Sequence, residues 1–155
     1  MHTIHTREYL AADAWACLDV LRTAVRITGR QFYGPAQLTS WLARTPSVHT
    51  FHQRLAPSLT CRVAFDGRGI YAFANITPAG YVDFVMCHPR RARHGAGRRL
   101  LLELMGSADA HGVAVLTAQA SLAARPLFEA CGFEVEENRE VLGLACFGMV
   151  CPLSL

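Results

Sequence analysis

The sequence predicts a single α+β domain with a mixed, mostly antiparallel central sheet flanked by helices. Between residues 59 and 87, apolar and polar residues alternate with period two and are interrupted by short turns rich in glycine and proline. That pattern is typical of consecutive antiparallel strands. On both sides of this block, apolar residues recur every three or four positions, as in helices that cover a sheet. The length of 155 residues suits one domain, residues 1–155.

The first part of the chain predicts one strand and two helices. Alternation indicates the strand, a shared apolar face indicates the first helix, and the Gly34-Pro35 turn starts the second. Pro46 and Pro57 act as breakers, so the segment around them is expected to be irregular. In order, the expected elements are a strand at His2–Tyr9, a helix at Leu10–Val25, a short helix within Gln31–Ala43 and an irregular Thr45–Ser58.

The rest of the chain predicts a hairpin, a third strand, two helices and a closing pair of strands. Val113–Ala118 is short and continuously apolar, which favours a buried parallel strand. Gly132 is placed to end the helix before it. The expected strands are Leu59–Asp66, Ile70–Thr77, Tyr81–Cys87, Val113–Ala118, Phe133–Asn138 and Leu144–Val150, and the expected helices are Gly95–His111 and Ser121–Cys131.

Composition excludes several classes of function. The net charge of +3 is too small for a general polyanion binder. The six cysteines form no CxxC pair and no zinc-ligand spacing, so we expect no metal site and no disulfide framework. Reduced cysteines, together with the lack of a secretory signal, favour a cytoplasmic protein. The apolar run Val141–Leu155 is too short and too broken to span a membrane, so no membrane partner is expected.

The junction Cys87–Met105 concentrates positive charge and backbone freedom. All fifteen basic residues of the chain are arginines, and five of them lie between Arg90 and Arg99. Gly95 and Gly97 stand where a strand passes into a helix, whose first N–H groups lack partners and carry partial positive charge. Such a junction suits a phosphate or pyrophosphate, although a plain solvated loop is the alternative. The chain has no lysine for a Walker loop, and Leu100 replaces the third glycine of a dinucleotide fingerprint.

With these residues in view, the chain resembles the GCN5-related N-acetyltransferase (GNAT) family. The family loop V-x-P-x-x-[RQ]-x-x-G-x-[GA] is similar to CHPRRARHGAG, Cys87–Gly97. The segment Ala120–Phe133 looks like the second family signature, and Thr6–Leu21 looks like the usual first strand and helix. The resemblance implies an acyl-CoA N-acyltransferase-like fold. It also implies transfer of an acetyl group from acetyl-CoA to the primary amine of a small molecule or peptide by direct attack.

The resemblance also implies which residues hold acetyl-CoA. Main-chain groups of Met86, Cys87 and His88 would pair with the pantetheine arm. Three residues later in the chain would flank the distal arm, and a six-residue segment would hold the pyrophosphate. The flanking residues are Ser121, Ala124 and Phe128, and the pyrophosphate residues are Arg93, His94, Gly95, Ala96, Gly97 and Arg98.

Two positions depart from the family pattern. Ala92 stands where the family has Arg or Gln, and we expect Arg91 or Arg93 to supply the missing charge. Phe128 stands where many members have a tyrosine that is thought to protonate the departing thiolate. Phenylalanine donates no proton; a thiolate is a fairly good leaving group, so water can suffice, and the general acid is left unassigned. These departures favour an alternative function, a catalytically weak or inactive CoA-binding regulatory module.

Asp83 is the candidate general base. Strand alternation predicts that it shares a face with Val85 and Cys87, and apolar surroundings would suit a base. The alternative is that Asp83 faces solvent or pairs with an arginine. A strand N–H near Met86 would polarise the thioester carbonyl.

Other candidates are expected at the acceptor side or as structural residues. Tyr33, Trp41 and Asn75 would contact the amine acceptor, although aromatic residues at helical spacing are often core residues. The cysteines are more simply buried thiols than nucleophiles. No aromatic residues are interleaved with the arginines, so nucleic-acid binding ranks low. The apolar C-terminal strand suggests a possible homodimer.

Overall fold

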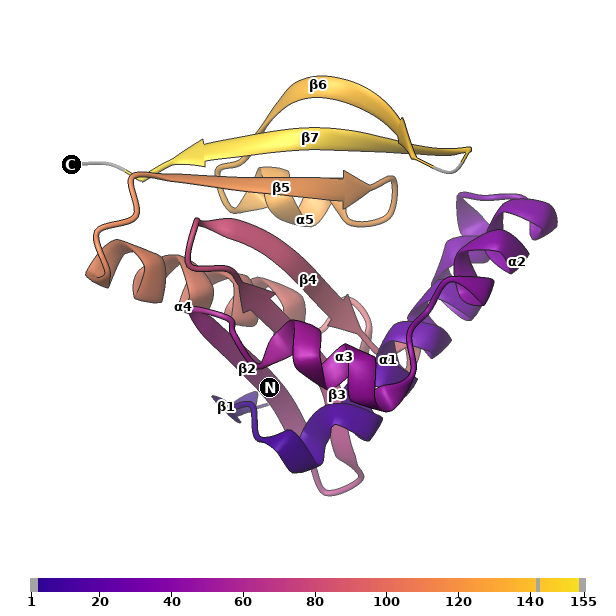
Figure 1. Ribbon diagram of the computed structural model, residues 1–155, viewed down its shortest axis with the longest axis horizontal. Coiled ribbons are helices and arrows are strands. Elements are labelled where there is room, and N and C mark those ends of the chain that lie inside the picture. Colours follow the sequence, from indigo (N-terminus) through magenta and orange to yellow (C-terminus); the bar gives the residue numbers. More distant parts are fainter. Residues whose placement is uncertain (1–2, 142, 154–155) are drawn as a thin grey trace.

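The computed structural model describes residues 3–141 and 143–153. Seven strands form one sheet in the order β1-β2-β3-β4-β5-β7-β6 (Figure 1). In these residues β4 and β5 pair in parallel, and the other neighbours are antiparallel, which confirms the predicted mixed sheet. The strands are β1 (His5–Glu8), β2 (Thr60–Asp66), β3 (Gly69–Ile76), β4 (Tyr81–Cys87), β5 (Val115–Ser121), β6 (Glu134–Val141) and β7 (Leu144–Pro152).

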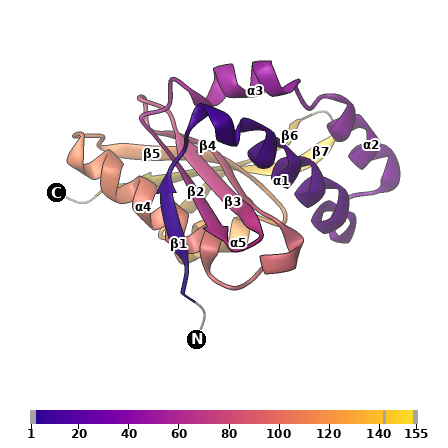
Figure 2. The same cartoon turned by 90° about the horizontal axis from the view of Figure 1, so that it is seen from below.

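Helices cover both faces of the sheet (Figures 1 and 2). Three of them, α1, α2 and α3, pack on one face, and α4 and α5 pack on the other. The α-helices are α1 (Ala14–Ile27), α2 (Pro35–Ala43), α3 (Val48–Leu55), α4 (Ala96–Ala110) and α5 (Arg125–Ala130). Short 3₁₀ turns lie at η1 (Ala11–Asp13), η2 (Thr28–Gln31) and η3 (Pro89–Arg91).

Each face of the sheet has its own apolar core. On the α4 face, alternate strand residues pack against Leu100, Leu101 and Leu104, which repeat at helical spacing and are fully buried. On the α1 face, Phe51 of α3 contacts Phe73 and Phe84 of the sheet edge-on, with ring centroids 5.7 and 5.6 Å apart. Because each core draws on alternate residues of the same strands, the period-two pattern of the sequence fixes both cores.

Strands β4 and β5 separate soon after they meet (Figure 1). Their parallel pairing joins Tyr81 to Thr117 and Val82 to Ala118, and no later pair is formed in the described residues. Beyond this point β4 remains paired with β3, and β5 remains paired with β7. The facing edges of β4 and β5 therefore keep main-chain hydrogen-bonding groups available to a third, extended partner.

A bulge interrupts β4 at Asp83. Asn75 pairs with Phe84 and Ile76 pairs with Val82, so Asp83 is the extra residue. The side chain of Asn75 accepts a hydrogen bond from the Phe84 N–H at 2.9 Å. Because the bulge shifts the alternation, Asp83 points toward α3, whereas Val85 and Cys87 pack on the α4 face. The prediction that these three residues share one face is therefore wrong.

Two boundary predictions also fail. The segment expected to be irregular at 45–58 contains helix α3, which begins after Ser47, whose side chain accepts a hydrogen bond from Thr50 N. The breaking prolines lie just outside the helix ends. The helix expected at Ser121–Cys131 is shorter, because Ser121 ends β5 and α5 begins at Arg125.

Candidate active site

A pocket of about 490 Å³ opens where β4 and β5 separate. Its walls come from the end of α1, η2 and α2 on one side and from β4, the start of α4 and the β5–α5 connection on the other. Its volume is typical of a small-molecule or cofactor site. Pocket-lining residues predicted as cofactor contacts are Met86, Cys87, Arg93, Gly95, Ala96, Gly97, Arg98, Ser121 and Ala124.

The start of α4 lies at one end of this pocket. Gly95 is the N-cap residue with φ +93°, a left-handed conformation that favours glycine, and no side chain caps the helix. Arg93 is also left-handed, with φ +63°, which is rare for a residue with a side chain. The first-turn N–H groups, which no intrahelical carbonyl can accept, thus line the pocket. This geometry suits a phosphate group.

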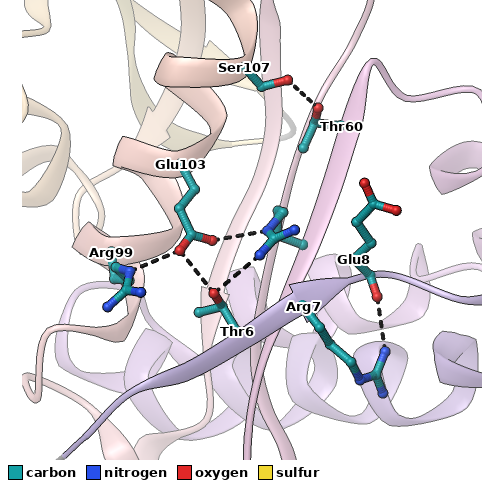
Figure 3. A network of polar contacts seen from close by, with 8 residues as sticks. Thr6, Arg7, Glu8, Thr60, Arg99, Glu103 and Ser107 are labelled. Carbon is teal, nitrogen blue, oxygen red and sulfur yellow. Dashed lines mark hydrogen bonds and ion pairs between the residues drawn. The ribbon is translucent and has the colours of Figure 1, made fainter.

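Three of the five junction arginines form ion pairs within the fold and do not line the pocket. Arg99 donates to Glu103 at 2.8 Å, and Glu103 also accepts from Thr6 at 2.9 Å and from Arg62 at 3.0 Å (Figure 3). This network fastens α4 to β1 and β2, so it fixes the direction in which the start of the helix points.

The other two, Arg90 and Arg91, turn back onto the β2–β3 hairpin. Arg90 donates to both oxygens of Asp66 at 2.9 and 3.3 Å, and Arg91 lies 3.6 Å from the same carboxylate. Both guanidinium groups stack on the ring of Tyr71, 5.4 and 4.6 Å from its centroid. The hydrogen bond from Arg90 is the main reason that the pKa of Asp66 falls to about 2. Asp66 thus acts as an anchor for the loop before α4.

Arg93 and Arg98 remain as the arginines available to a ligand. Both line the pocket, and neither forms an ion pair in the described part of the chain. The expected substitute for the family residue replaced by Ala92 is therefore Arg93, because Arg91 is held by Asp66 and Tyr71. The five junction arginines therefore have three positions: Arg90 and Arg91 hold the loop, Arg99 holds α4, and Arg93 and Arg98 line the pocket.

Three predicted cofactor residues lie outside the pocket lining. His88 Nδ1 accepts from Arg90 N at 3.1 Å and so caps η3, and burial followed by Arg90 lowers the His88 pKa. His94 is exposed on the loop. Phe128 is 4% exposed and packs edge-on against Phe133, with ring centroids 5.0 Å apart. Phe128 therefore belongs to the core behind the pocket.

The ladder between β3 and β4 shows which main-chain groups face the gap. The N–H of His88 donates to Tyr71 O at 2.7 Å, so this is a hydrogen-bonded pair. In an antiparallel ladder such pairs alternate, which directs the main-chain groups of Met86 toward β3 and those of Val85 and Cys87 toward β5. The N–H groups that can polarise a carbonyl therefore flank Met86 instead of belonging to it, and the N–H of His88 is already used.

The thiol of Cys87 lines the pocket but is poorly suited to nucleophilic attack. Burial raises its pKa to about 11, and the nearby Arg90 and Arg91 offset this only in part. Burial likewise raises the pKa of Cys61 to about 12 and that of Cys131. All six cysteines are free thiols in the structure.

Asp83 lies where β4 and β5 part, but both of its oxygens bind Arg54. Arg54 Nε and a terminal nitrogen donate at 2.8 and 2.6 Å, and the Asp83 side chain is only 8% exposed. The guanidinium of Arg54 also stacks on Phe84, 4.5 Å from the ring centroid. The alternative of an arginine partner for Asp83 is therefore what the structure shows, and Asp83 is not a lining residue of the pocket.

The predicted acceptor residues separate into two groups. Tyr33 and Trp41 line the pocket and meet edge-on, with ring centroids 5.9 Å apart. Asn75 is 1% exposed, donates to Ser58 Oγ at 3.0 Å and accepts from Phe84 N, so it holds the bulge instead of contacting a ligand. The apolar residues at the end of α1 were not identified as pocket residues from the sequence, although their helical spacing could be recognised there.

Two kinds of site have no counterpart in the described residues. Residues 3–141 and 143–153 contain no group of three or more His, Cys, Asp or Glu side chains arranged to hold a metal ion. Among the same residues, every helix is too short or too polar to cross a bilayer. The strand suggested as a dimer surface, β7, lies inside the sheet between β5 and β6, and the homodimer stays a prediction.

Comparisons with known proteins agree with this geometry. The sequence is 27% identical over 141 residues to YafP of Escherichia coli K12, described as an uncharacterized N-acetyltransferase, covering 91% of this chain and 88% of that protein. The fold matches a GCN5-related N-acetyltransferase from Rhodopseudomonas palustris with a TM-score of 0.91, at 24% identity and coverage of 99% and 98%. It also matches the PaiA N-acetyltransferase from Thermoplasma acidophilum, solved with coenzyme A, with a TM-score of 0.82, 18% identity and coverage of 98% and 100%.

The family assignment rests on most of the chain. The family model of the acetyltransferase (GNAT) domain matches residues 30–153, which include the sheet from β2 to β7, the glycine-led start of α4 and most of the residues that line the pocket. The glycine-led start of α4 directly after β4 is the feature that the resemblance led us to expect. The chain belongs to the GNAT acetyltransferase family.

Proposed function

We propose that this protein transfers the acetyl group of acetyl-CoA to the primary amine of a small acceptor. The observation that carries the proposal is the continuity of one pocket from the uncapped start of α4 to the gap between β4 and β5. The pyrophosphate would bind the N–H groups of residues 95–98 together with Arg93 and Arg98. The pantetheine arm would extend β4 by pairing with the free main-chain groups of Val85 and Cys87.

Attack by the amine on the thioester is direct in this proposal. The amine nitrogen bonds to the carbonyl carbon, the carbon–sulfur bond breaks, and an amide and free CoA result. The N–H of Val85 or Cys87 would stabilise the oxyanion. An acyl-cysteine intermediate is disfavoured, because a thiol with a pKa of about 11 carries almost no thiolate at neutral pH.

Proton transfer in this mechanism uses Asp83 and water. Asp83 adjoins the last β4–β5 pair, and a carboxylate has about four lone-pair sites, of which Arg54 occupies two. We propose that the remaining sites take the ammonium proton through a water molecule. Phe128 offers no proton, and the Tyr33 hydroxyl already donates to Ala145 O at 3.0 Å, so water protonates the thiolate.

Initial rates of thiol release from acetyl-CoA with an amine panel test this function. Intersecting double-reciprocal lines support direct attack, whereas parallel lines indicate a covalent intermediate. Asp83→Ala should lower kcat by about 10²–10⁴-fold if Asp83 is the base. Arg54→Ala is the matched control, because it removes the same ion pair and keeps the carboxylate. Equal losses in both variants would reduce Asp83 to a structural role.

A CoA-binding regulatory module is the second candidate. Its support is the buried position of Phe128, which leaves the described pocket without a family-type proton donor. Tight binding of acetyl-CoA without transfer to any amine would favour this function over the first.

A further inference from the structure

The end of the pocket away from α4 is mostly apolar, and its described lining residues carry no charge. Its walls there come from α1, η2 and α2, with two aromatic rings meeting edge-on. The tyrosine hydroxyl adds no free polar group, since it donates to Ala145 O and accepts from Leu122 N, both at 3.0 Å. The apolar residues of these walls are Ala24, Val25, Ile27, Phe32, Tyr33 and Trp41, and the uncharged residues Thr28, Gly29 and Gln31 also line them.

Among the residues that the structure describes, no acidic side chain lines the pocket. The charged residues among its walls are Arg93 and Arg98, both at the phosphate end. Asp83, which is the carboxylate nearest in sequence to the β4 wall, is engaged by Arg54 and stands outside the lining. A second ammonium group on an acceptor would therefore lie against pocket walls that offer it no carboxylate. Burial of an unpaired charge is strongly unfavourable.

The helices around this end also carry positive charge. Between residues 14 and 44 the chain holds four arginines and a single acid, Asp19. Arg22 is bonded to Thr45 Oγ1 and to Pro46 O, neither of which is an anion, so its charge is not neutralised. Arg26 and Arg30 are exposed on the segment that lines the pocket. A polycationic acceptor would be repelled on approach as well as on burial.

From these walls and charges we infer that the acceptor is a monoamine with an apolar, aromatic-sized body and no second positive charge. This inference rests on the proposed function and specifies its substrate class. The apolar body packs against Trp41 and Phe32, and the amine lies toward the β4–β5 gap. Diamines, polyamines and aminoglycosides are poor acceptors.

The test compares hexylamine with 1,6-diaminohexane at saturating acetyl-CoA, because these amines differ essentially in one terminal charge. We expect kcat/KM to be at least tenfold higher for hexylamine, and higher again for 2-phenylethylamine. Trp41→Glu should narrow the hexylamine advantage with the KM for acetyl-CoA unchanged. Trp15→Glu is the matched control, since Trp15 is 59% exposed at the other end of α1 and should leave the ratio unaltered. Equal use of the diamine, or preference for it, overturns the inference.

Binding separates this inference from the proposed function. If acetyl-CoA binds and no amine is acetylated, each amine is titrated into the CoA-saturated protein and followed by tryptophan fluorescence. If hexylamine then binds more tightly than the diamine, the inferred preference for monoamines is supported although the proposed transferase function is not. Equal affinities, or no binding of either amine, overturn the specificity.

Discussion

Gly97 offers the sharpest perturbation of the phosphate-binding end. It stands in the first turn of α4, and a Cβ added there would lie 3.1 Å from Leu127 Cδ2 and 3.8 Å from Val85 Cγ1. The close atom is the end of a flexible side chain, so the helix accommodates a substitution with a small shift. Any side chain at this position nevertheless projects between the pocket walls, where the pyrophosphate is proposed to bind.

Gly97→Glu places a carboxylate beside that pyrophosphate. Two like charges about 4 Å apart repel by about 4 kcal/mol at an effective dielectric constant of about 20. If salt screening removes roughly half of this, about 2 kcal/mol remains, which corresponds to a dissociation constant about 30-fold weaker. A glutamate in the first turn also interacts favourably with the helix dipole, so the fold should be retained.

Calorimetric titration with acetyl-CoA measures this effect. Gly106→Glu is the matched control, because it makes the same charge change on the same helix at an exposed position with no atom within 4 Å of the added Cβ. It should bind acetyl-CoA as the parent does. Unchanged affinity in Gly97→Glu, or equal loss in both variants, would refute the placement of the pyrophosphate.

Three further predictions concern the scaffold of the site. Because the pKa of Asp66 is lowered, its ion pairs stabilise the protein above about pH 4, and this stabilisation is lost as the pH falls toward about 2. Asp66→Asn should lower the urea midpoint at pH 7 and reduce the loss of stability on acidification. An unchanged dependence of stability on pH would contradict this prediction. Phe51→Ala should cost about 3–5 kcal/mol in urea unfolding, since the ring is fully buried between two others, and a loss below about 1 kcal/mol would argue against that packing. Gly80→Ala should lower the melting temperature more than Gly143→Ala. Both glycines have left-handed backbone conformations, but only a Cβ at residue 80 would lie 2.8 Å from Val115 O. Equal melting temperatures of the two variants would contradict this contact.

Much of the fold follows from local pattern. The hairpin, the third strand and α4 were predicted near their observed bounds, because period-two and helical spacing there reflect burial directly. Helix α3 was missed because Pro46 and Pro57 were interpreted as breakers of the whole segment. They bound the helix instead, and Ser47 as N-cap with Phe51 and Leu55 buried at helical spacing was the available signal.

The part of the site that could be predicted from the sequence is the main-chain conformation that the glycines allow. The glycine-led start of α4 was visible in the sequence, whereas the bulge at Asp83 was not, because it depends on the register between two strands. The same limit applies to the arginines. Arg90 and Arg91 are held away from the pocket by Asp66, which is distant in sequence, whereas the partner of Arg99 is Glu103, only four residues further along α4.

Calorimetric titration of the unmodified protein with acetyl-CoA, with CoA and ATP as comparisons, tests the central claim most directly. We expect acetyl-CoA and CoA to bind at a stoichiometry of one, with dissociation constants on the order of micromolar, within the range usual for enzyme substrates. ATP should bind more weakly, because it lacks the pantetheine arm that pairs with Val85 and Cys87. Absence of heat with acetyl-CoA, or equal affinity for ATP, would contradict the assignment of the pocket to an acyl-CoA donor.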